Sequence, residues 1–219
     1  MGFVVTVSGA VGGIGTSTFA YALALQAPGP ALLIDGQPDG VPLDLTLGIE
    51  AEPGARWSSV RLGSADIVTS TVLEALPVSH GVRVLSADRE AVADPTAMAL
   101  LVTAMREACD LIVLDLPMRA ADASALNPDL RLLLVPPTTP GLGAALVATR
   151  TGHAIVGVDT GQGGIPIGRF HEYLEHPVAG IVRWQRAVTV AAESCLPPPS
   201  STDIARLARL IWGGVSDAA

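Results

Sequence analysis

Lysine is absent from this chain of 219 residues, because all thirteen of its basic residues are arginine. The absence excludes every mechanism that depends on a lysine amine, including Schiff-base catalysis. Cysteine is almost as scarce: only Cys109 and Cys195 occur, far apart and outside any metal-ligand spacing. Two such thiols are typical of free cysteines in a reducing compartment, so we expect a cytoplasmic protein.

Long apolar runs and an excess of basic charge are also missing. No run reaches the roughly 20 apolar residues that span a bilayer, and the first residues lack the basic segment of a signal peptide. A net charge of -8 disfavours binding to nucleic acid. What is present is a hydrophobic content of 49%, which favours a folded body with a large core over disorder.

Short apolar runs alternate with helical patterns along the chain, which is typical of an α/β protein with a mostly parallel sheet. The runs lack polar alternation, as expected for strands buried on both faces. They predict seven strands, at residues 3–8, 31–35, 82–86, 111–115, 132–136, 154–158 and 178–182. Helices are predicted at residues 17–26, 94–108, 141–150, 167–174, 186–194 and 202–212. We expect one domain over residues 1–219, a three-layer sandwich with a Pro-rich spacer at 196–201 before the last helix.

A glycine-rich loop follows the first predicted strand and precedes a helix, at residues 8–18 (SGAVGGIGTST). Glycines let the backbone approach a ligand closely and adopt positive φ, so that successive N–H groups converge. The helix N-terminus adds roughly half a positive charge. The loop therefore predicts a phosphate-binding site, and a tight turn without a ligand is the simpler alternative.

The spacing of Gly9, Gly13 and Gly15 also matches the Gly-x-x-x-Gly-x-Gly pattern of short-chain dehydrogenases. Those NAD(P)-dependent enzymes use a Tyr-x-x-x-Lys pair to move a proton, and this chain has no lysine. Their Asn-Asn-Ala-Gly stretch is missing as well. A hydride-transfer oxidoreductase is therefore the less favoured alternative.

Three motifs together resemble those of the MinD/ParA superfamily of P-loop NTPases. Residues 12–18 (GGIGTST) resemble its deviant Walker A loop, Lys-Gly-Gly-x-Gly-Lys-Thr-Thr, residues 32–35 (LLID) its second acidic strand, and residues 111–117 (LIVLDLP) its Walker B strand. Within that superfamily the loop resembles the branch of the CpaE and TadZ pilus-assembly proteins and the actinobacterial septum-site-determining proteins, whose members often read Gly-Gly-x-Gly-Thr-Ser as residues 12–17 do here. The resemblance implies a P-loop NTPase-like fold, a homodimer, and a role in pilus or secretion assembly or in septum-site determination during cell division.

The same resemblance implies the residues of a nucleotide site. The residues expected to hold the phosphates of ATP or ADP are Gly12, Gly13, Ile14, Gly15, Thr16, Ser17 and Thr18. Ser17 is expected to ligate Mg²⁺, Asp115 to hold the ion through water, and Asp35 to support the same shell. Either carboxylate alone could instead simply end a strand.

Departures from the superfamily pattern weaken the expected chemistry. The two lysines of the superfamily fall on Val11 and Thr16, and an acidic residue thought to orient the attacking water falls on Gln37. Losing one electrostatic group of this kind commonly slows a reaction by a factor of ~10²–10³. We therefore expect weak binding of nucleotide with little or no hydrolysis, and we assign no catalytic residue.

A slow ATPase of the same fold is the alternative. It would require Arg89 or Arg119 to supply the missing charge, with Asp39 partly replacing the acidic residue at position 37. A glutamine can also orient water, as it does in some GTPases.

Two further features concern the base and the C-terminal part. Trp184 follows the last predicted strand, where it would either stack on adenine or, as the favoured reading, cover the end of the sheet. The last predicted helix is amphipathic, with only Arg206 and Arg209 as basic residues. We expect its apolar face to pack on the sheet, with no direct membrane contact.

Overall fold

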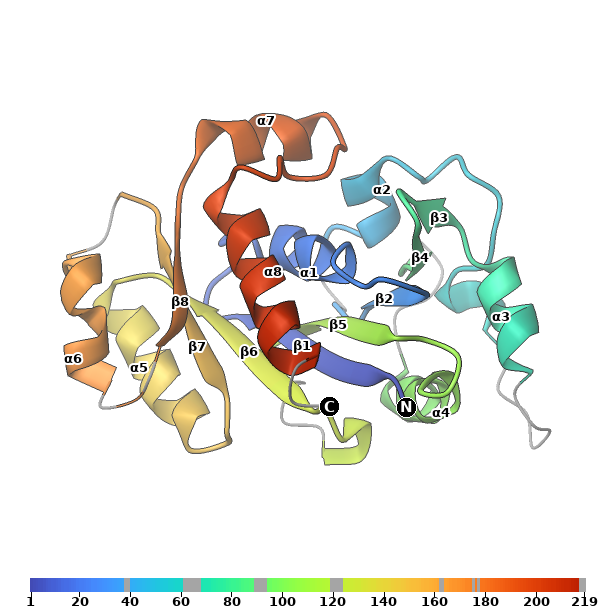
Figure 1. The fold of residues 1–219 in the computed structure, drawn as a ribbon, viewed down its shortest axis with the longest axis horizontal. Coiled ribbons are helices and arrows are strands. Elements are labelled where there is room, and N and C mark those ends of the chain that lie inside the picture. Colours follow the sequence, from blue (N-terminus) through green and yellow to red (C-terminus); the bar gives the residue numbers. More distant parts are fainter. Residues whose placement is uncertain are drawn as a thin grey trace.

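The computed structural model of the chain describes residues 1–37, 40–60, 68–88, 94–118, 124–161, 164–174, 176 and 178–216. Within these residues an eight-stranded sheet forms the middle layer (Figure 1). The strands are β1 (Phe3–Gly9), β2 (Ala31–Asp35), β3 (Val78–Ser79), β4 (Val82–Leu85), β5 (Leu111–Pro117), β6 (Leu130–Val135), β7 (Ala154–Asp159) and β8 (Val178–Arg183). Their order is β3-β4-β2-β5-β1-β6-β7-β8, and every described pair is parallel except β3 with β4.

Helices connect the strands and cover both faces of the sheet. They are α1 (Thr16–Ala24), α2 (Leu43–Leu47), α3 (Thr69–Ala75), α4 (Pro95–Met105), α5 (Thr139–Thr149), α6 (Phe170–Leu174), α7 (Arg186–Glu193) and α8 (Asp203–Ser216). Short 3₁₀ turns lie at Trp57–Ser59, Ser124–Leu126 and Ile167–Arg169. Side chains cap the starts of three described helices, since Asp94 accepts from the Ala97 N–H, Thr138 from the Gly141 N–H and Thr202 from the Ala205 N–H. None of the helices in the described ranges is long and apolar enough to cross a membrane.

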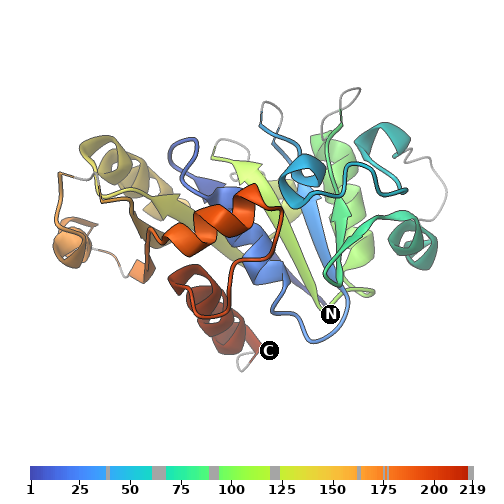
Figure 2. The same cartoon turned by 90° about the horizontal axis from the view of Figure 1, so that it is seen from above.

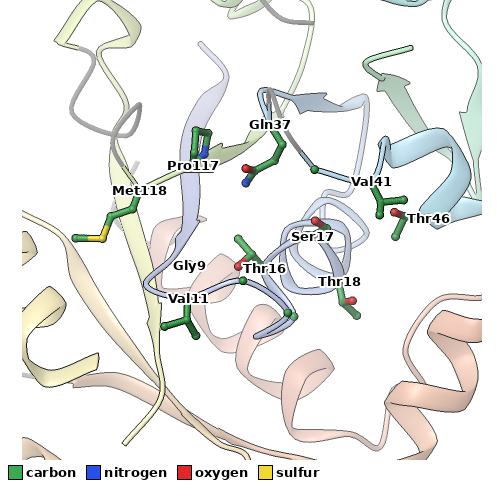
Figure 3. A pocket seen from close by; sticks show the side chains of 14 residues that line it. Gly9, Val11, Thr16, Ser17, Thr18, Gln37, Val41, Thr46, Pro117 and Met118 are labelled. Atoms are coloured by element: carbon green, nitrogen blue, oxygen red, sulfur yellow. The ribbon is translucent and has the colours of Figure 1, made fainter. Parts of the chain in front are cut away.

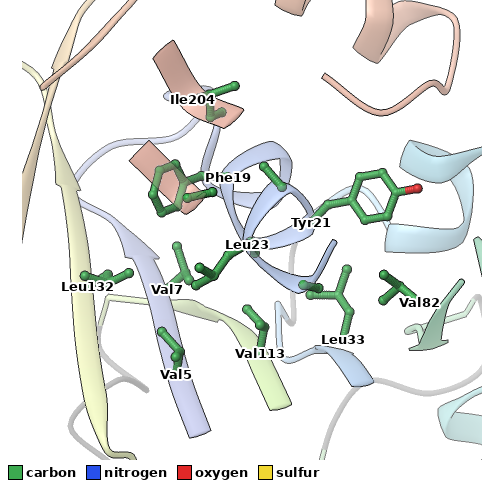
Figure 4. Packing of buried hydrophobic residues seen from close by; sticks show 14 of the residues in the cluster. Val5, Val7, Phe19, Tyr21, Leu23, Leu33, Val82, Val113, Leu132 and Ile204 are labelled. Carbon is green, nitrogen blue, oxygen red and sulfur yellow. The ribbon is translucent and has the colours of Figure 1, made fainter. Parts of the chain in front are cut away.

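The core lies in two layers, one on each face of the sheet. Successive strand residues point to opposite faces, so Val5 and Val7 pack with Phe19 of α1 on one side (Figure 4). On the opposite face, Val4 belongs to the cluster that contains residues of α4, and Leu133 to the cluster of α5 and α6. Figure 2 shows α8 on one side of the sheet and α4 and α5 on the other. The predicted three-layer α/β sandwich is therefore confirmed.

All seven predicted strands are present, with ends that differ by at most two residues. The prediction missed β3, α2 and α3, because elements of two to seven residues are too short to show a reliable hydrophobic period. The last helix also continues beyond residue 212, through the Gly213–Gly214 pair to Ser216. Its apolar face packs on the core as expected, with Ile204, Leu207 and Ala208 buried.

The strand order brings three strand ends to one edge of the sheet. β5 lies between β1 and β2, and Asp35 at the end of β2 is the register partner of Asp115 in β5. The loop after β1 emerges beside them. Open α/β sheets bind ligands outside the carboxyl ends of their strands, so this edge is where a site is expected.

Candidate functional site

The loop between β1 and α1 presents its backbone to open space. Gly13 and Gly15 have φ angles of 72° and 90°, in the left-handed region that favours glycine. A side chain added at Gly12, Gly13 or Gly15 would meet no atom within 4 Å. Gly15 is the N-cap residue of α1 and no side chain caps the helix, so the first amides of α1 remain free for a ligand. This geometry suits an anion, which supports the phosphate reading over a tight closed turn.

A cavity of about 510 Å³, which we call the loop cavity, lies in front of these amides (Figure 3). The side chains of Thr16 and Gln37 point toward the same open space. The lining residues are Gly9, Val11, Gly12, Gly13, Gly15, Thr16, Ser17, Thr18, Gln37, Gly40, Val41, Thr46, Pro117 and Met118. Six of the seven predicted loop residues line it, namely the glycines at 12, 13 and 15 with Thr16, Ser17 and Thr18, while Ile14 lines the neighbouring pocket described below.

Asp115 is fully buried and does not itself line the cavity, but it contacts the lining residue Gln37, and one of its oxygens has no partner among the described residues. Its Oδ1 accepts a hydrogen bond of 3.1 Å from Nε2 of Gln37, whereas Oδ2 has no donor among the described residues. The pKa of Asp115 is raised to about 6, mainly by burial and to a small extent by the neighbouring Asp35, while the hydroxyl of Ser17 and the amide of Gln37 act to lower it. A buried carboxylate oxygen without a donor requires an explanation, and a divalent cation or its water is one that the donor set fits.

Asp35 has the same chemistry but different surroundings. Its Oδ1 accepts from the N–H of Gln37 at 3.0 Å, and its Oδ2 accepts from the N–H groups of Leu43 at 3.0 Å and Ala87 at 3.2 Å. Burial raises the pKa of Asp35, and these three backbone donors act to lower it. The carboxylate therefore binds the backbone at Gln37 and at Leu43, and Gln37, Gly40 and Val41 line the loop cavity. It lies beside Asp115 as predicted, and its role toward a metal remains a prediction.

The two positions that carry lysine in the resembled superfamily have neutral side chains at the cavity. Thr16 lies so close to Gly9 that a side chain at Gly9 would collide with its hydroxyl. Val11 is 41% exposed at the cavity mouth. The residues proposed to compensate, Asp39, Arg89 and Arg119, lie outside the described residues.

A second pocket of about 240 Å³, which we call the Trp184 pocket, borders the other side of the glycine loop. It is lined by Gly13, Ile14, Gly15, Thr18, Val158, Thr160, Val182, Arg183, Trp184, Gln185, Val188, Thr189, Ala192 and Ile204. Trp184 is 62% exposed, so most of its surface is not packed against the sheet. This differs from the interpretation favoured from the sequence, in which Trp184 covers the end of the sheet. Since Gly13, Gly15 and Thr18 line both pockets, a polar cavity and a more apolar one meet along one loop.

Several residues that line the two pockets were not predicted from the sequence. Thr46 belongs to α2, which was too short to predict, and Val188 and Thr189 belong to a predicted helix whose position was unknown. No local pattern distinguishes these residues from ordinary helix residues, because only the packing of α2 and α7 around α1 brings them to the loop.

Two comparisons with known proteins concern the sequence. No family model matches the chain. The chain is 34% identical over 224 residues to an uncharacterized protein of Mycobacterium tuberculosis, found in strains H37Rv and CDC 1551. That match covers 87% of this chain and 62% of the relative, so the chain spans less than two thirds of the relative's length.

Solved structures resemble the whole chain. The MinC:MinD cell division complex of Aquifex aeolicus matches with a TM-score of 0.73 and 19% identity, over 96% of both chains. A ParA family ATPase from Chlorobium tepidum TLS matches at 0.69 and 14%, over 95% of this chain and 96% of the other. A putative plasmid partition protein from Borrelia burgdorferi B31, bound to AMPPNP, matches at 0.68 and 14% over all of both chains. Likeness at this identity establishes the fold, and we conclude that the chain has the α/β fold of the MinD/ParA P-loop ATPases.

Proposed function

We propose that this chain is a MinD/ParA-like nucleotide-binding protein, with the phosphates of ATP or ADP in the loop cavity and the base in the Trp184 pocket. The observation that carries the proposal is the open glycine backbone followed by a helix without a side-chain cap. Free amides and a helix N-terminus attract anions, and phosphate is the usual ligand of such a loop. The AMPPNP-bound plasmid partition protein with the same fold supports this choice of ligand.

Magnesium fits the residues beside the loop cavity. Ser17 lines the cavity with a hydroxyl, and Asp115 contributes the buried oxygen without a donor. These two side chains would hold the ion, and the ion when bound would neutralise phosphate charge. Asp35 would act through the backbone segment that it holds, because its oxygens already accept hydrogen bonds.

Little or no hydrolysis is expected from this site. The loop cavity has Val11 and Thr16 where charge would stabilise the transferring phosphoryl group. A slow ATPase is the second candidate, and Gln37 favours it, because its amide lines the cavity and could orient a water molecule. Oxidoreductase activity is less favoured, since the strand order differs from the 3-2-1-4-5-6 order of dinucleotide-binding folds.

The cellular role follows from resemblance. We infer a positioning or scaffold protein of the CpaE type that forms a homodimer and recruits pilus, secretion or division proteins. The structural likeness to MinD, a cell division protein that is seen in complex with MinC, supports a role of this class. The loss of charged catalytic groups suits a protein whose bound state recruits partners without turnover.

Titration with a fluorescent ADP analogue in the presence of Mg²⁺ tests the site. Gly12→Val would place a side chain in the open space of the loop without positive-φ strain, so binding should be lost while the melting temperature stays the same. Gly143→Val, at an exposed helix position outside both pockets, is the matched control and should bind as the parent does. Equal binding by the parent and the Gly12 variant would contradict the proposed site. Phosphate release at the rate of an ordinary MinD-type ATPase would contradict the weak-hydrolysis part.

A further inference from the structure

Trp184 has a fixed backbone although its ring is exposed. The Trp184 N–H donates to the carbonyl of Asp159 at 2.7 Å, so the residue extends the pairing of β8 with β7 by one step. The ring itself is 62% exposed and lines the Trp184 pocket. A ligand that stacks on a ring with an ordered backbone pays less conformational entropy than one that must order the backbone as well. The backbone of Trp184 is therefore already in place for a stacked ligand.

Both neighbours of Trp184 are hydrogen-bonded to one residue, Asp203, which is the first residue of α8. Oδ2 of Asp203 accepts the N–H of Arg183 at 3.4 Å and lies 3.7 Å from Nη1 of the same arginine. The N–H of Asp203 donates to Oε1 of Gln185 at 2.6 Å. We call these three interactions the Asp203 contacts. They fasten residues 183 and 185, and with them the residue between, to the start of α8.

Asp203 acts on the pocket through other residues. Arg183, Trp184 and Gln185 line the Trp184 pocket, whereas Asp203 is not among the described residues that line it. The next residue of α8, Ile204, does line it and is buried in the core. The wall of the pocket therefore joins the end of β8 to the start of α8.

The helix α8 lies close against β8. A side chain added at Gly180 in β8 would meet Cδ1 of Leu207 at 2.3 Å, so the helix occupies the space that a larger residue would need. Leu207 and Ile204 belong to the same buried cluster as Val182 of β8. Figure 2 shows α7 and α8 on the same side of the sheet. The position of α8 thus fixes where the loop with Trp184 can lie.

From these contacts, and resting on the proposed nucleotide site, we propose that Asp203 is a positioning residue of the base pocket and couples base binding to the docking of α8. A ligand that binds one conformation stabilises that conformation, so a base stacked on Trp184 stabilises the docked state of α8. A ligand that fills only the loop cavity leaves this equilibrium unchanged. The base and the phosphates therefore have separate effects on the protein.

Isothermal titration calorimetry with ADP and with inorganic pyrophosphate, each with Mg²⁺, separates the two parts of the site. Both ligands carry two phosphates, and only ADP carries a base. We expect the parent protein to bind ADP about tenfold more tightly than pyrophosphate, which is the usual contribution of a stacked base. Hydrogen exchange measured by mass spectrometry gives the second readout. ADP should slow the exchange of amides in the first turns of α8, and pyrophosphate should not.

Asp203→Ala removes the acceptor of the Arg183 N–H without changing the lining of the pocket. It should lower the ratio of ADP to pyrophosphate affinity at least about threefold, leave the pyrophosphate affinity unchanged, and abolish the protection of α8 by ADP. Asp203→Asn keeps an oxygen for the same N–H and should retain most of the ratio. Glu193→Ala is the charge-matched control, because it removes a carboxylate from an exposed position at the end of α7. It should leave the ratio unchanged.

The outcomes separate this inference from the proposed function. If neither ligand binds to the parent protein, the nucleotide site itself is wrong, and the coupling falls with it. If ADP binds but Asp203→Ala keeps the parent ratio and the protection of α8, nucleotide binding stands and only the coupling is overturned. Equal losses for ADP and pyrophosphate in Asp203→Ala would also overturn it, because they would show that Asp203 serves the fold as a whole.

Discussion

Asp35 and Asp115 are register partners on the neighbouring strands β2 and β5, yet their carboxylates have opposite hydrogen-bonding states. Both oxygens of Asp35 accept backbone N–H groups, whereas Oδ2 of Asp115 has no donor among the described residues. The first carboxylate thus stabilises the fold around the site, and the second is left available to a ligand. Four variants test this division and the features that surround it.

Asp115→Asn should make the protein more stable at neutral pH while it abolishes magnesium-dependent nucleotide binding. The folded state raises the pKa of Asp115 from its ordinary 3.8 to about 6, so the folded protein holds this proton more tightly than the unfolded chain. Stability from this group is therefore fully present below about pH 4 and falls as the pH rises to about 6. Above that pH the ionised carboxylate lowers the free energy of unfolding by about 3 kcal/mol.

Urea unfolding of the parent and the Asp115→Asn variant at pH 5 and pH 8 measures this effect. The asparagine keeps an oxygen for the Gln37 amide, so the variant should gain more at pH 8 than at pH 5. A gain that is independent of pH would show that the carboxylate is not the group responsible.

Asp35→Ala should destabilise the fold strongly. It removes the acceptor of the N–H groups of Gln37, Leu43 and Ala87, and a buried donor without a partner costs about 1–3 kcal/mol. We expect a loss of at least about 3 kcal/mol in the free energy of unfolding, measured by urea denaturation. Asp159→Ala is the control, because Asp159 accepts from Gly161 in an exposed turn, and it should lose less than about 1 kcal/mol. Similar losses in both variants would contradict the role of Asp35 as the acceptor of these three backbone N–H groups.

Arg56→Met should also be costly, because it leaves a buried charge unpaired. Arg56 lies 2.9 Å from Asp44 and donates to the carbonyl of Ile49, and both charged side chains are about 90% buried. Breaking such a pair typically costs about 3–5 kcal/mol. The exposed pair of Arg169 and Glu172 has a similar distance of 2.8 Å, so Arg169→Met is a matched control that should cost under about 1 kcal/mol. Chemical denaturation of both variants measures the two losses in the free energy of unfolding. Equal losses would contradict the expectation that the buried pair matters more than the exposed one.

Trp184→Ala should weaken nucleotide binding and leave the apo protein almost as stable as before. The ring is 62% exposed at the edge of its pocket, so its removal takes little from the core. Stacking of a base on an aromatic ring is worth about 1–3 kcal/mol, which corresponds to roughly tenfold in affinity or more. Trp184→Phe should keep most of that affinity. Calorimetric dissociation constants that are identical in the parent and the alanine variant would exclude a stacking role.

Local sequence patterns predicted a large part of this protein. Buried strands appear as short apolar runs, so all seven long strands of the sheet were predicted. The glycine loop was recognised from its position between a predicted strand and a predicted helix. The absence of lysine is a property of the composition alone, and it excludes an ammonium group at the loop in any conformation.

Only the packed structure distinguishes Asp35 from Asp115. Both end apolar runs, and nothing in their neighbours along the chain shows which carboxylate will be satisfied. The donors that decide it come from Leu43 and Ala87, which are 8 and 52 residues from Asp35, and from Gln37, which is 78 residues from Asp115. Trp184 is exposed for the same kind of reason, because the position of α7 and α8 sets the pocket beside it. Chain-local patterns determine strands and loops, whereas the hydrogen-bond partners of a buried charge depend on segments that only folding brings together.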